Sequence, residues 1–308
     1  MRVFVTGGTG LVGSRLVQQL LTRGDVPVVL SRRPDSARKS LGPHLEIVEG
    51  DPARQGPWMD RIPTCDGVIH LAGENVFARR WTDSFKQQLV DSRVQSSNNI
   101  ASALKREPRR ADGSPKVLIS ASAIGYYGPH GDEELTEEAS PSQDFMGQLC
   151  VDWEKAARSA ESVGIRTAQV RVGIVLDKEG GALAKLLTPF RMFVGGPVAS
   201  GRQYMSWIHH EDLVSLFLFA LDNPRVTGPL NGTAPNPVTN SEFSRSLGKA
   251  LHRPSLVWTP GFALRILLGE AAAIVTSGQR VIPARPLALG YTFRYPTLQP
   301  ALAQILSN

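Results

Sequence analysis

Cysteine is scarce in this sequence. Cys65 and Cys150 are its only two cysteines among 308 residues, they lie far apart, and neither has the spacing of a zinc ligand. These features argue against a disulfide framework and a zinc site, so we expect no metal. Isolated cysteines are typical of a reducing compartment, and we therefore expect a cytoplasmic protein.

Long hydrophobic runs are also missing. The longest apolar stretch covers residues 213–221, which is too short to span a bilayer and is typical of a buried helix. No charged and apolar leader precedes the first expected strand, so we expect neither secretion nor a membrane partner. The sequence has no internal repeats and no low-complexity tract, as is usual for a globular enzyme.

Acidic residues are slightly fewer than basic residues. The chain has 28 Asp and Glu and 34 Lys and Arg, which gives a net charge of +6. The basic residues fall in scattered loops at 32–39, 79–80 and 105–110, and no basic helix with interleaved aromatic residues occurs. We therefore expect no nucleic-acid partner, and an anionic cofactor and substrate account for part of the excess.

The most informative stretch lies at the N-terminus, where a short apolar strand runs into a glycine-rich turn followed by helical periodicity. Gly7 turns the chain sharply, Gly10 lets the backbone approach a pyrophosphate, and Gly13 lets helix and strand pack closely. The diphosphate would lie on the free N–H groups of the helix. The alternative is a tight turn without a ligand. The residues that we expect to bind the dinucleotide here are Gly7, Thr9, Gly10, Leu11, Val12 and Gly13.

The end of the second expected strand indicates which dinucleotide binds. The strand at 26–30 ends in Ser31, Arg32 and Arg33, and no acid stands there to accept a hydrogen bond from a free 2′-hydroxyl. Serine and arginine instead offer donors and positive charge to a 2′-phosphate. The sequence therefore predicts NADP(H), the alternative being a solvated basic loop.

Strands alternate with helices through the first half of the chain, which predicts an α/β fold with a doubly wound parallel sheet, the Rossmann fold. Further strands are expected at 45–51, 67–73, 116–120, 167–171 and 228–231, with helices at about 81–104 and 145–162. Glycine and proline become frequent after residue 173, as expected where the chain leaves the sheet to build a cap. We predict a Rossmann domain at 1–173 and 205–233, and a smaller discontinuous C-terminal cap at 174–204 and 234–308.

Motifs along the whole chain resemble the extended short-chain dehydrogenase/reductase superfamily, in its NAD(P)-dependent epimerase/dehydratase branch. Within that branch, the doubled tyrosine and the C-terminal motifs are similar to an atypical subgroup labelled only as epimerase family proteins. The motifs that carry the resemblance lie at 6–13, 50–51, 71–75, 120–128, 171–176, 207–212, 231–240, 278–283 and 290–296.

The resemblance implies further contacts to the cofactor. Asp51 would meet the adenine amino group, Arg93 would reach the phosphates or a ribose, and Val175 would lie beside the nicotinamide. Each has a structural alternative: a turn cap for Asp51, a surface charge for Arg93 and plain core for Val175. The backbone that would line the middle of the cofactor comprises Leu71, Ala72 and Gly73.

The usual proton-transfer pair of the superfamily is missing. In that pair a lysine stands four residues after a tyrosine on a helix, lowers the pKa of the phenol and holds the ribose. Alignment on Glu154 puts Met146 at the tyrosine position and Cys150 at the lysine position. Lys155 is turned about 140° away from Cys150 around the helix, so it is no ready substitute. Ser122 matches the serine that orients the reacting oxygen.

Two functions remain open, and we favour the first. In the first, the protein is an NADPH-dependent oxidoreductase or epimerase whose acid is relocated to Tyr126 or Tyr127. A phenol with a pKa of about 10 is a poor base but a workable acid, which favours reduction. In the second, the fold binds NADPH without turnover and acts as a regulatory or redox-sensing protein.

The sequence predicts the substrate only as a small polar molecule. Lys185, Arg191 and Arg202 in the expected cap would suit an anionic ligand such as a nucleotide sugar, although ordinary surface charge explains them equally well. We expect His209 to be structural. A homodimer through helices that flank the sheet would be common for this superfamily.

Overall fold

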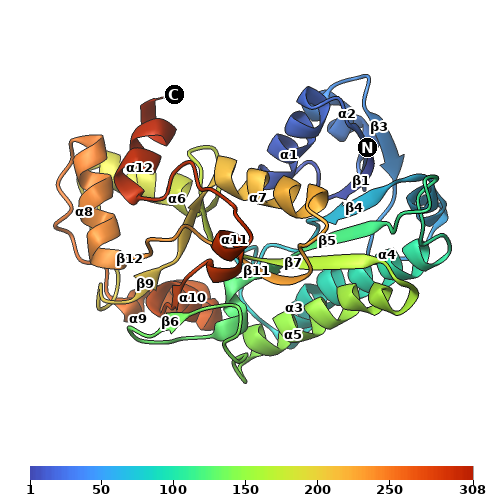
Figure 1. Cartoon of the computed structure of the whole chain (residues 1–308). Coiled ribbons are helices and arrows are strands. Elements are labelled where there is room, and N and C mark those ends of the chain that lie inside the picture. Colours follow the sequence, from blue (N-terminus) through green and yellow to red (C-terminus); the bar gives the residue numbers. More distant parts are fainter. Residues whose placement is uncertain (308) are drawn as a thin grey trace.

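The computed structural model describes residues 1–307, and its centre is a seven-stranded parallel sheet (Figure 1). The strand order is β11-β7-β5-β4-β1-β2-β3, so the order reverses between β1 and β4. Ligands of such sheets bind beyond the carboxyl ends of the strands at this reversal. The predicted doubly wound sheet is therefore confirmed. The strands are β1 (Arg2–Thr6), β2 (Val26–Ser31), β3 (Glu46–Glu49), β4 (Gly67–His70), β5 (Val117–Ala123), β7 (Arg166–Val172) and β11 (Gly228–Gly232).

Helices cover both faces of the sheet because its strands are apolar on both sides. Val3 and Val5 pack with α1 (Leu11–Thr22) and α7 (His210–Asp222), whereas Phe4 between them faces the opposite helices. Those opposite helices are α4 (Ser96–Lys105), α5 (Phe145–Arg158) and the short η1 (Pro57–Thr64) and η4 (Ser159–Val163). The helix α2 (Pro34–Leu41) joins β2 to β3. The apolar run at 213–221 lies in α7, and none of the helices in residues 1–307 is long and apolar enough to cross a membrane.

The helix expected at about 81–104 is interrupted by a π-turn. Its first part is α3 (Asp83–Val90), its second is α4, and η2 (Asp91–Gln95) between them has π-helical hydrogen bonding. One extra residue in a turn leaves no clear mark on hydrophobic periodicity. Such π-turns are rare and occur frequently at functional sites.

Many of the remaining described residues form a second cluster on the left in Figure 1, with its own apolar core of residues such as Leu183, Trp207, Phe243 and Leu302, whereas α11 (Ala284–Ala288) packs on β11. Its helices are α6 (Gly181–Arg191), α8 (Asn240–Leu251), α9 (Gly261–Leu268), η5 (Gly269–Ala272), α10 (Ala273–Thr276) and α12 (Leu298–Ser307). The paired short strands are β8 (Ile174–Leu176) with β10 (Trp207–His209), β9 (Tyr204–Met205) with β12 (Val238–Thr239), and β6 (Glu134–Leu135) with β13 (Arg280–Val281). We keep the domain limits given above as a proposal.

Candidate cofactor and active site

The glycine-rich turn forms a cradle that only glycine fits. Gly7 has φ of +70°, and a Cβ on it would lie 2.8 Å from the backbone nitrogen of Ala72. A Cβ on Gly13 would lie 2.1 Å from the carbonyl oxygen of Gly7. Gly10 caps α1 without a side-chain hydrogen bond, and the first turn of α1 has no acidic residue. The N–H groups of this turn and its positive dipole are therefore available to an anion.

A loop from the second cluster covers this cradle, which the sequence did not predict. A Cβ on Gly180 would lie 3.1 Å from Cδ1 of Leu11, and one on Gly181 would lie 3.4 Å from the carbonyl oxygen of Val175. Val175 is half-buried in β8 close to this loop. The loop is fastened by Asp177, a fully buried carboxylate 2.7 Å from the guanidinium of Arg15 on α1. In the sequence, the glycine pair at 180–181 indicated a turn here but not its contact with Leu11.

The end of β2 presents basic residues to solvent. The backbone N–H of Arg33 donates to Oγ of Ser31 at 3.1 Å, and α2 begins at the next residue. Arg32 is exposed, and its guanidinium makes no hydrogen bond or ion pair with any of residues 1–307. Arg38 differs because it pairs with Asp35 at 3.1 Å. This end of the strand can therefore receive a phosphate through Arg32 and the start of α2.

The backbone stretch after β4 is held against β1. The N–H of Leu71 donates to the carbonyl oxygen of Thr6 at 3.1 Å, and that of Ala72 donates to Oγ1 of Thr6 at 3.3 Å. Gly73 follows and is exposed at the reversal of strand order. Asp51 accepts a hydrogen bond from the N–H of Ala53 at 3.1 Å through Oδ1, so it caps a turn with one oxygen.

Arg93 projects from the π-turn toward this stretch. Its guanidinium carbon would lie 3.3 Å from a Cβ on Gly73, and its Nη2 donates to the carbonyl oxygen of Glu74 at 2.8 Å. It also faces the ring of Trp153 at 5.2 Å. The guanidinium therefore lies beside the exposed backbone of Gly73, where a ligand at the strand ends would meet it.

Two residues without a predicted role connect β1, β4 and α4 beneath the stretch. Nδ1 of His70 lies 2.6 Å from Oγ1 of Thr6, and its Nε2 lies 3.0 Å from Oγ of Ser96. Burial, and to a lesser degree the positive charge of Arg93, lowers the pKa of His70 to about 3. The imidazole is therefore neutral at physiological pH and supports the strand ends.

Ser122 is tied to a buried ion pair. Its hydroxyl donates to Oε1 of Glu154 at 2.7 Å. The same carboxylate receives two hydrogen bonds from Arg171, at 2.8 Å from Nε and 3.0 Å from Nη2. All three side chains are buried. Because its proton points to Glu154, Ser122 does not offer that proton to a substrate.

Tyr127 belongs to the same network. Its side chain is 0% exposed, its hydroxyl donates to Oδ1 of Asn231 at 2.6 Å, and it accepts from Nη1 of Arg171 at 2.9 Å. Burial raises the pKa of Tyr127 to about 12 against the opposing effect of Arg171. This geometry does not favour proton transfer from Tyr127 to a ligand.

Tyr126 lies differently from its neighbour. It is half-buried, the guanidinium of Arg171 lies 3.5 Å from its ring centre, and its ring meets that of Tyr127 edge-on at 5.2 Å. Its hydroxyl makes no hydrogen bond to another of residues 1–307, unlike that of Tyr127. Of the two tyrosines, Tyr126 thus has the hydroxyl that remains free for a ligand.

The α5 positions aligned with the superfamily's tyrosine and lysine face the end of β5. A Cβ on Gly125 would lie 3.3 Å from Cε of Met146 and 4.0 Å from Sγ of Cys150. Burial raises the pKa of Cys150 to about 12, so the thiol stays protonated. Lys155 is exposed to solvent. These side chains of α5 supply no group that moves a proton at neutral pH.

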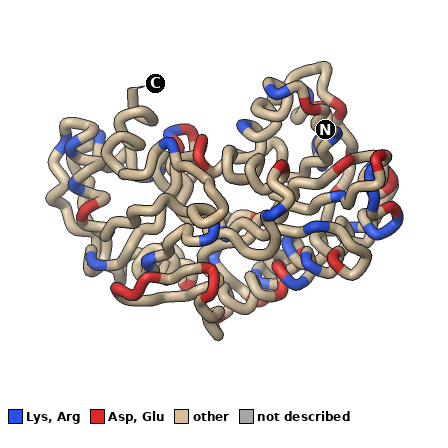
Figure 2. The backbone as a smooth tube through the Cα atoms, viewed as in Figure 1, with Lys and Arg blue, Asp and Glu red and all other residues tan. Residues whose placement is uncertain are grey.

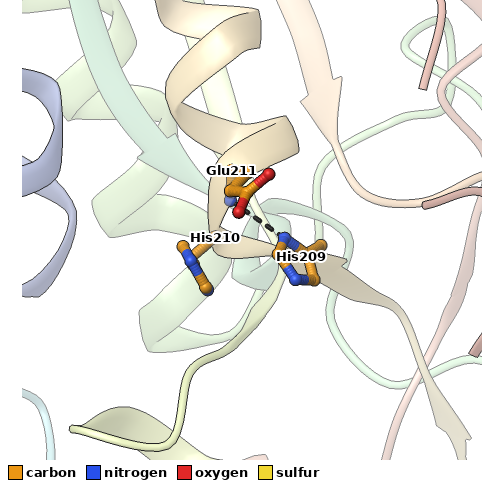
Figure 3. Close-up of side chains that lie close together, drawn as sticks. All are labelled: His209, His210 and Glu211. Atoms are coloured by element: carbon orange, nitrogen blue, oxygen red, sulfur yellow. Dashed lines mark hydrogen bonds between the residues drawn. The ribbon is translucent and has the colours of Figure 1, made fainter. Parts of the chain in front are cut away.

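His209, His210 and Glu211 bring their potential ligand atoms within 4.8 Å of one another (Figure 3). Nδ1 of His209 accepts from the backbone N–H of Glu211 at 3.1 Å, and its Nε2 pairs with Oε1 of Gln304 at 2.8 Å. Both ring nitrogens of His209 are therefore engaged, which leaves no lone pair for a metal. Burial lowers its pKa to about 4, as suits a neutral helix cap.

A doubly wound sheet with a glycine cradle at its first turn, next to a loop from a second cluster, defines a dinucleotide-binding protein. The model of the NAD dependent epimerase/dehydratase family matches residues 3–231, and a domain of unknown function (DUF1731) matches residues 259–305. The chain belongs to the NAD dependent epimerase/dehydratase family. The resemblance stated from the sequence is confirmed.

Relatives and solved structures similar to this chain are named as epimerase family proteins or as a sugar epimerase. The chloroplastic SDR39U1 homologue of Arabidopsis thaliana, an epimerase family protein, is 39% identical over 99% of this chain and 87% of its own length. The crystal structure of human epimerase family protein SDR39U1 with NADPH is 34% identical, with a TM-score of 0.87 over 100% of both chains. A nucleoside-diphosphate sugar epimerase from Corynebacterium glutamicum is 32% identical, with a TM-score of 0.77 over 99% of this chain and 58% of its own.

Proposed function

We propose that this protein binds NADP(H) and acts as an NADPH-dependent oxidoreductase or epimerase on a small polar molecule, without the usual tyrosine–lysine pair. The observation that carries the proposal is the cradle. A side chain at position 7 or 13 would clash with the backbone, and the N-terminus of α1 beside these glycines has no side-chain cap. The human relative solved with NADPH supports the choice of cofactor.

The residues around the cradle fit the parts of this cofactor. The N–H groups at the start of α1 would hold the diphosphate, and Arg32 would hold the 2′-phosphate. The second oxygen of Asp51 would accept from the adenine amino group. Arg93, beside Gly73, would bind a phosphate or ribose hydroxyl, and it would also supply a fixed positive charge near the strand ends. Val175 would lie beside the nicotinamide.

Bound NADPH would supply a hydride, so the chain itself must supply a proton. Tyr126 is our candidate donor, because its hydroxyl is free where those of Ser122 and Tyr127 are engaged. A phenol without an adjacent lysine is a better acid than base at neutral pH, which favours reduction over oxidation. Ser122 and Tyr127 would then position the end of β5 through Glu154 and Arg171.

A second candidate is an NADPH-binding regulatory protein without turnover. It is favoured by the engaged hydroxyls of Ser122 and Tyr127 and by the neutral thiol of Cys150. Nucleotide sugars as substrates, a cytoplasmic location and a homodimer likewise remain predictions.

Single-turnover oxidation of protein-bound NADPH, followed by absorbance, separates the two candidates. Small-molecule fractions of a cell extract are added to the loaded protein, and reaction products are also examined for epimerised sugars. We expect one fraction to cause stoichiometric oxidation, and Tyr126→Phe to slow it about 100-fold while Tyr127→Phe changes it less than Tyr126→Phe does. NADPH binding with neither oxidation nor epimerisation by any fraction would establish the non-catalytic candidate.

A further inference from the structure

The second cluster carries large apolar side chains on its surface. They lie in the loop after α6, in the segment before α9, and on α9 itself, none of whose residues is buried. Isolated exposed apolar residues are ordinary, but a contiguous group marks an interaction surface. We call this group the apolar face; its main residues are Phe193, Leu256, Trp258, Phe262, Ile266 and Leu267, which are 56% to 85% exposed.

Backbone pairing makes the face continuous. The N–H of Val257 donates to the carbonyl oxygen of Gly195 at 3.2 Å, and that of Thr259 donates to the carbonyl oxygen of Pro197 at 2.9 Å. The indole of Trp258 donates to the carbonyl oxygen of Ala199 at 2.5 Å. Residues 195–199 and 257–259, more than fifty residues apart in the sequence, therefore lie side by side just before α9.

Phe193 is held in solvent where α6 ends. It has φ of +64°, and the N–H groups of Phe193 and Val194 donate to the carbonyl oxygens of Phe190 at 3.0 Å and of Pro189 at 2.9 Å, as in a left-handed helix end. The ring of Phe193 lies 4.6 Å from the guanidinium of Arg253, and the residue is 56% exposed. The end of α6 therefore presents an aromatic ring to solvent beside a cation.

The segments that carry the face contain basic but no acidic residues. Residues 191–199 and 253–267 contain three arginines, Arg191, Arg253 and Arg265, and no Asp or Glu. Figure 2 shows Lys and Arg at several points around this part of the backbone.

We propose that the apolar face is a docking surface for an anionic lipid bilayer. Trp258, Phe262 and Ile266 would enter the boundary between headgroups and acyl chains, while Arg191 and Arg265 would meet anionic headgroups. The docking is peripheral. It goes beyond the proposed function and differs from the sequence expectation of no membrane partner, which considered a spanning segment and a leader but no peripheral surface.

Charge complementarity selects the bilayer over a second copy of this chain. A two-fold interface places the same patch of both copies together, so Arg191, Arg253 and Arg265 would be brought near the same three arginines, with no acid from these segments to pair with them. An anionic surface neutralises the same groups and covers the apolar side chains at once.

Vesicle co-sedimentation of the full chain tests the proposal. We expect binding to vesicles of phosphatidylcholine with phosphatidylserine, at least about tenfold weaker binding to phosphatidylcholine alone, and weakening by salt. Trp258 provides a local readout, since Trp58, Trp153 and Trp207 are buried and Trp81 is half-buried. Its emission should shift to shorter wavelength on binding, and Trp258→Phe should remove the shift but not the binding.

Two variants and a control identify the surface. Phe262→Ser/Ile266→Ser and Arg191→Glu/Arg265→Glu should each weaken binding to the phosphatidylserine vesicles at least about tenfold. Leu287→Ser, 45% exposed on α11, should bind like the unchanged protein. NADPH affinity should stay unchanged in all of them, so a failure of the membrane proposal can be told apart from a failure of the proposed function.

The proposal is overturned if the protein does not bind phosphatidylserine vesicles at low salt, or if both variants bind them as well as the unchanged protein does. A dimer in sedimentation velocity that Phe262→Ser/Ile266→Ser abolishes, without vesicle binding, would instead assign the face to a second copy.

Discussion

The first turn of the sheet and the end of β5 lie on the same edge, yet they use their polar groups in opposite ways. At the first turn, the N–H groups of α1 and the guanidinium of Arg32 have no partner in residues 1–307 and are available to a ligand. At the end of β5, Ser122, Glu154 and Arg171 satisfy one another in a buried network. The first turn thus keeps its binding groups free, whereas at the end of β5 the hydroxyls of Ser122 and Tyr127 are engaged and that of Tyr126 is free.

Energetically the two ends also differ. The first turn is built from close backbone approach, which depends on the absence of a side chain at Gly7 and Gly13. The end of β5 depends on a buried ion pair, whose partners stabilise the fold only while both are present. Substitution of a free group at the first turn, such as Arg32, should therefore affect binding, and substitution within the ion pair at the end of β5 should affect folding.

The largest effect should follow from Glu154→Gln. This change leaves the buried guanidinium of Arg171 without its counter-charge, and we expect the free energy of unfolding in urea to fall by about 3 to 5 kcal/mol. The NADPH affinity of the protein that remains folded should change less than about threefold. Lys155→Gln on the exposed side of the same helix is the control and should leave stability unchanged. A loss of NADPH affinity without a loss of stability would break the division between the two ends.

A smaller effect is expected at the end of β2, on the cofactor-binding side of the sheet. Arg32→Glu replaces a free guanidinium with a carboxylate, so NADPH affinity should fall about tenfold to 100-fold while NADH affinity stays equal or rises. Fluorescence titration with both cofactors measures the ratio. Arg38→Glu is the matched control, since that guanidinium already pairs with Asp35. If Arg32→Glu keeps its preference for NADPH, the 2′-phosphate lies elsewhere.

The smallest effect is a pH dependence of protein stability, which comes from the buried His70 at the end of β4. The pKa of His70 is lowered to about 3, so below about pH 6.5 the unfolded chain binds a proton that the folded protein excludes. Its contribution is complete above pH 6.5 and decreases as the pH falls, by about 1 kcal/mol per pH unit. Cys150 and Tyr127, with pKa values raised to about 12, do not titrate in this range.

Urea unfolding between pH 5 and 7 measures this slope. His70→Gln, which keeps polar atoms near Thr6 and Ser96, should reduce the slope without abolishing it, because His209, whose pKa is lowered to about 4, contributes in the same range. The exposed His252→Gln should leave the slope unchanged. If the unchanged protein and His70→Gln show the same slope, His70 does not contribute to the pH dependence of stability.

The sheet and the cradle could be predicted because their signals are local. An apolar strand, three glycines and an amphipathic helix occupy consecutive positions, and their geometry follows from that order. The second cluster was predicted only in outline, because β9 and β12 have two residues each and so short a strand carries no period.

The roles of the hydroxyls could not be predicted in the same way. Whether Ser122 meets a substrate or Glu154 depends on how α5 packs across β5, which brings together residues 32 apart in the sequence. Adjacent Tyr126 and Tyr127 differ in the same way, since Asn231 reaches only one of them from β11. Such pairings arise from tertiary packing, which the spacing of residue types does not contain.

The loop at 177–181 lies on the first turn of α1, fastened by the buried contact between Asp177 and Arg15. A diphosphate seated on that turn would lie next to this loop, so its binding would depend on how the second cluster is held as well as on the contacts of the cradle. The coupling is reciprocal by thermodynamic necessity: whatever holds the second cluster down tightens the hold on the nucleotide, and the nucleotide steadies the second cluster by the same factor.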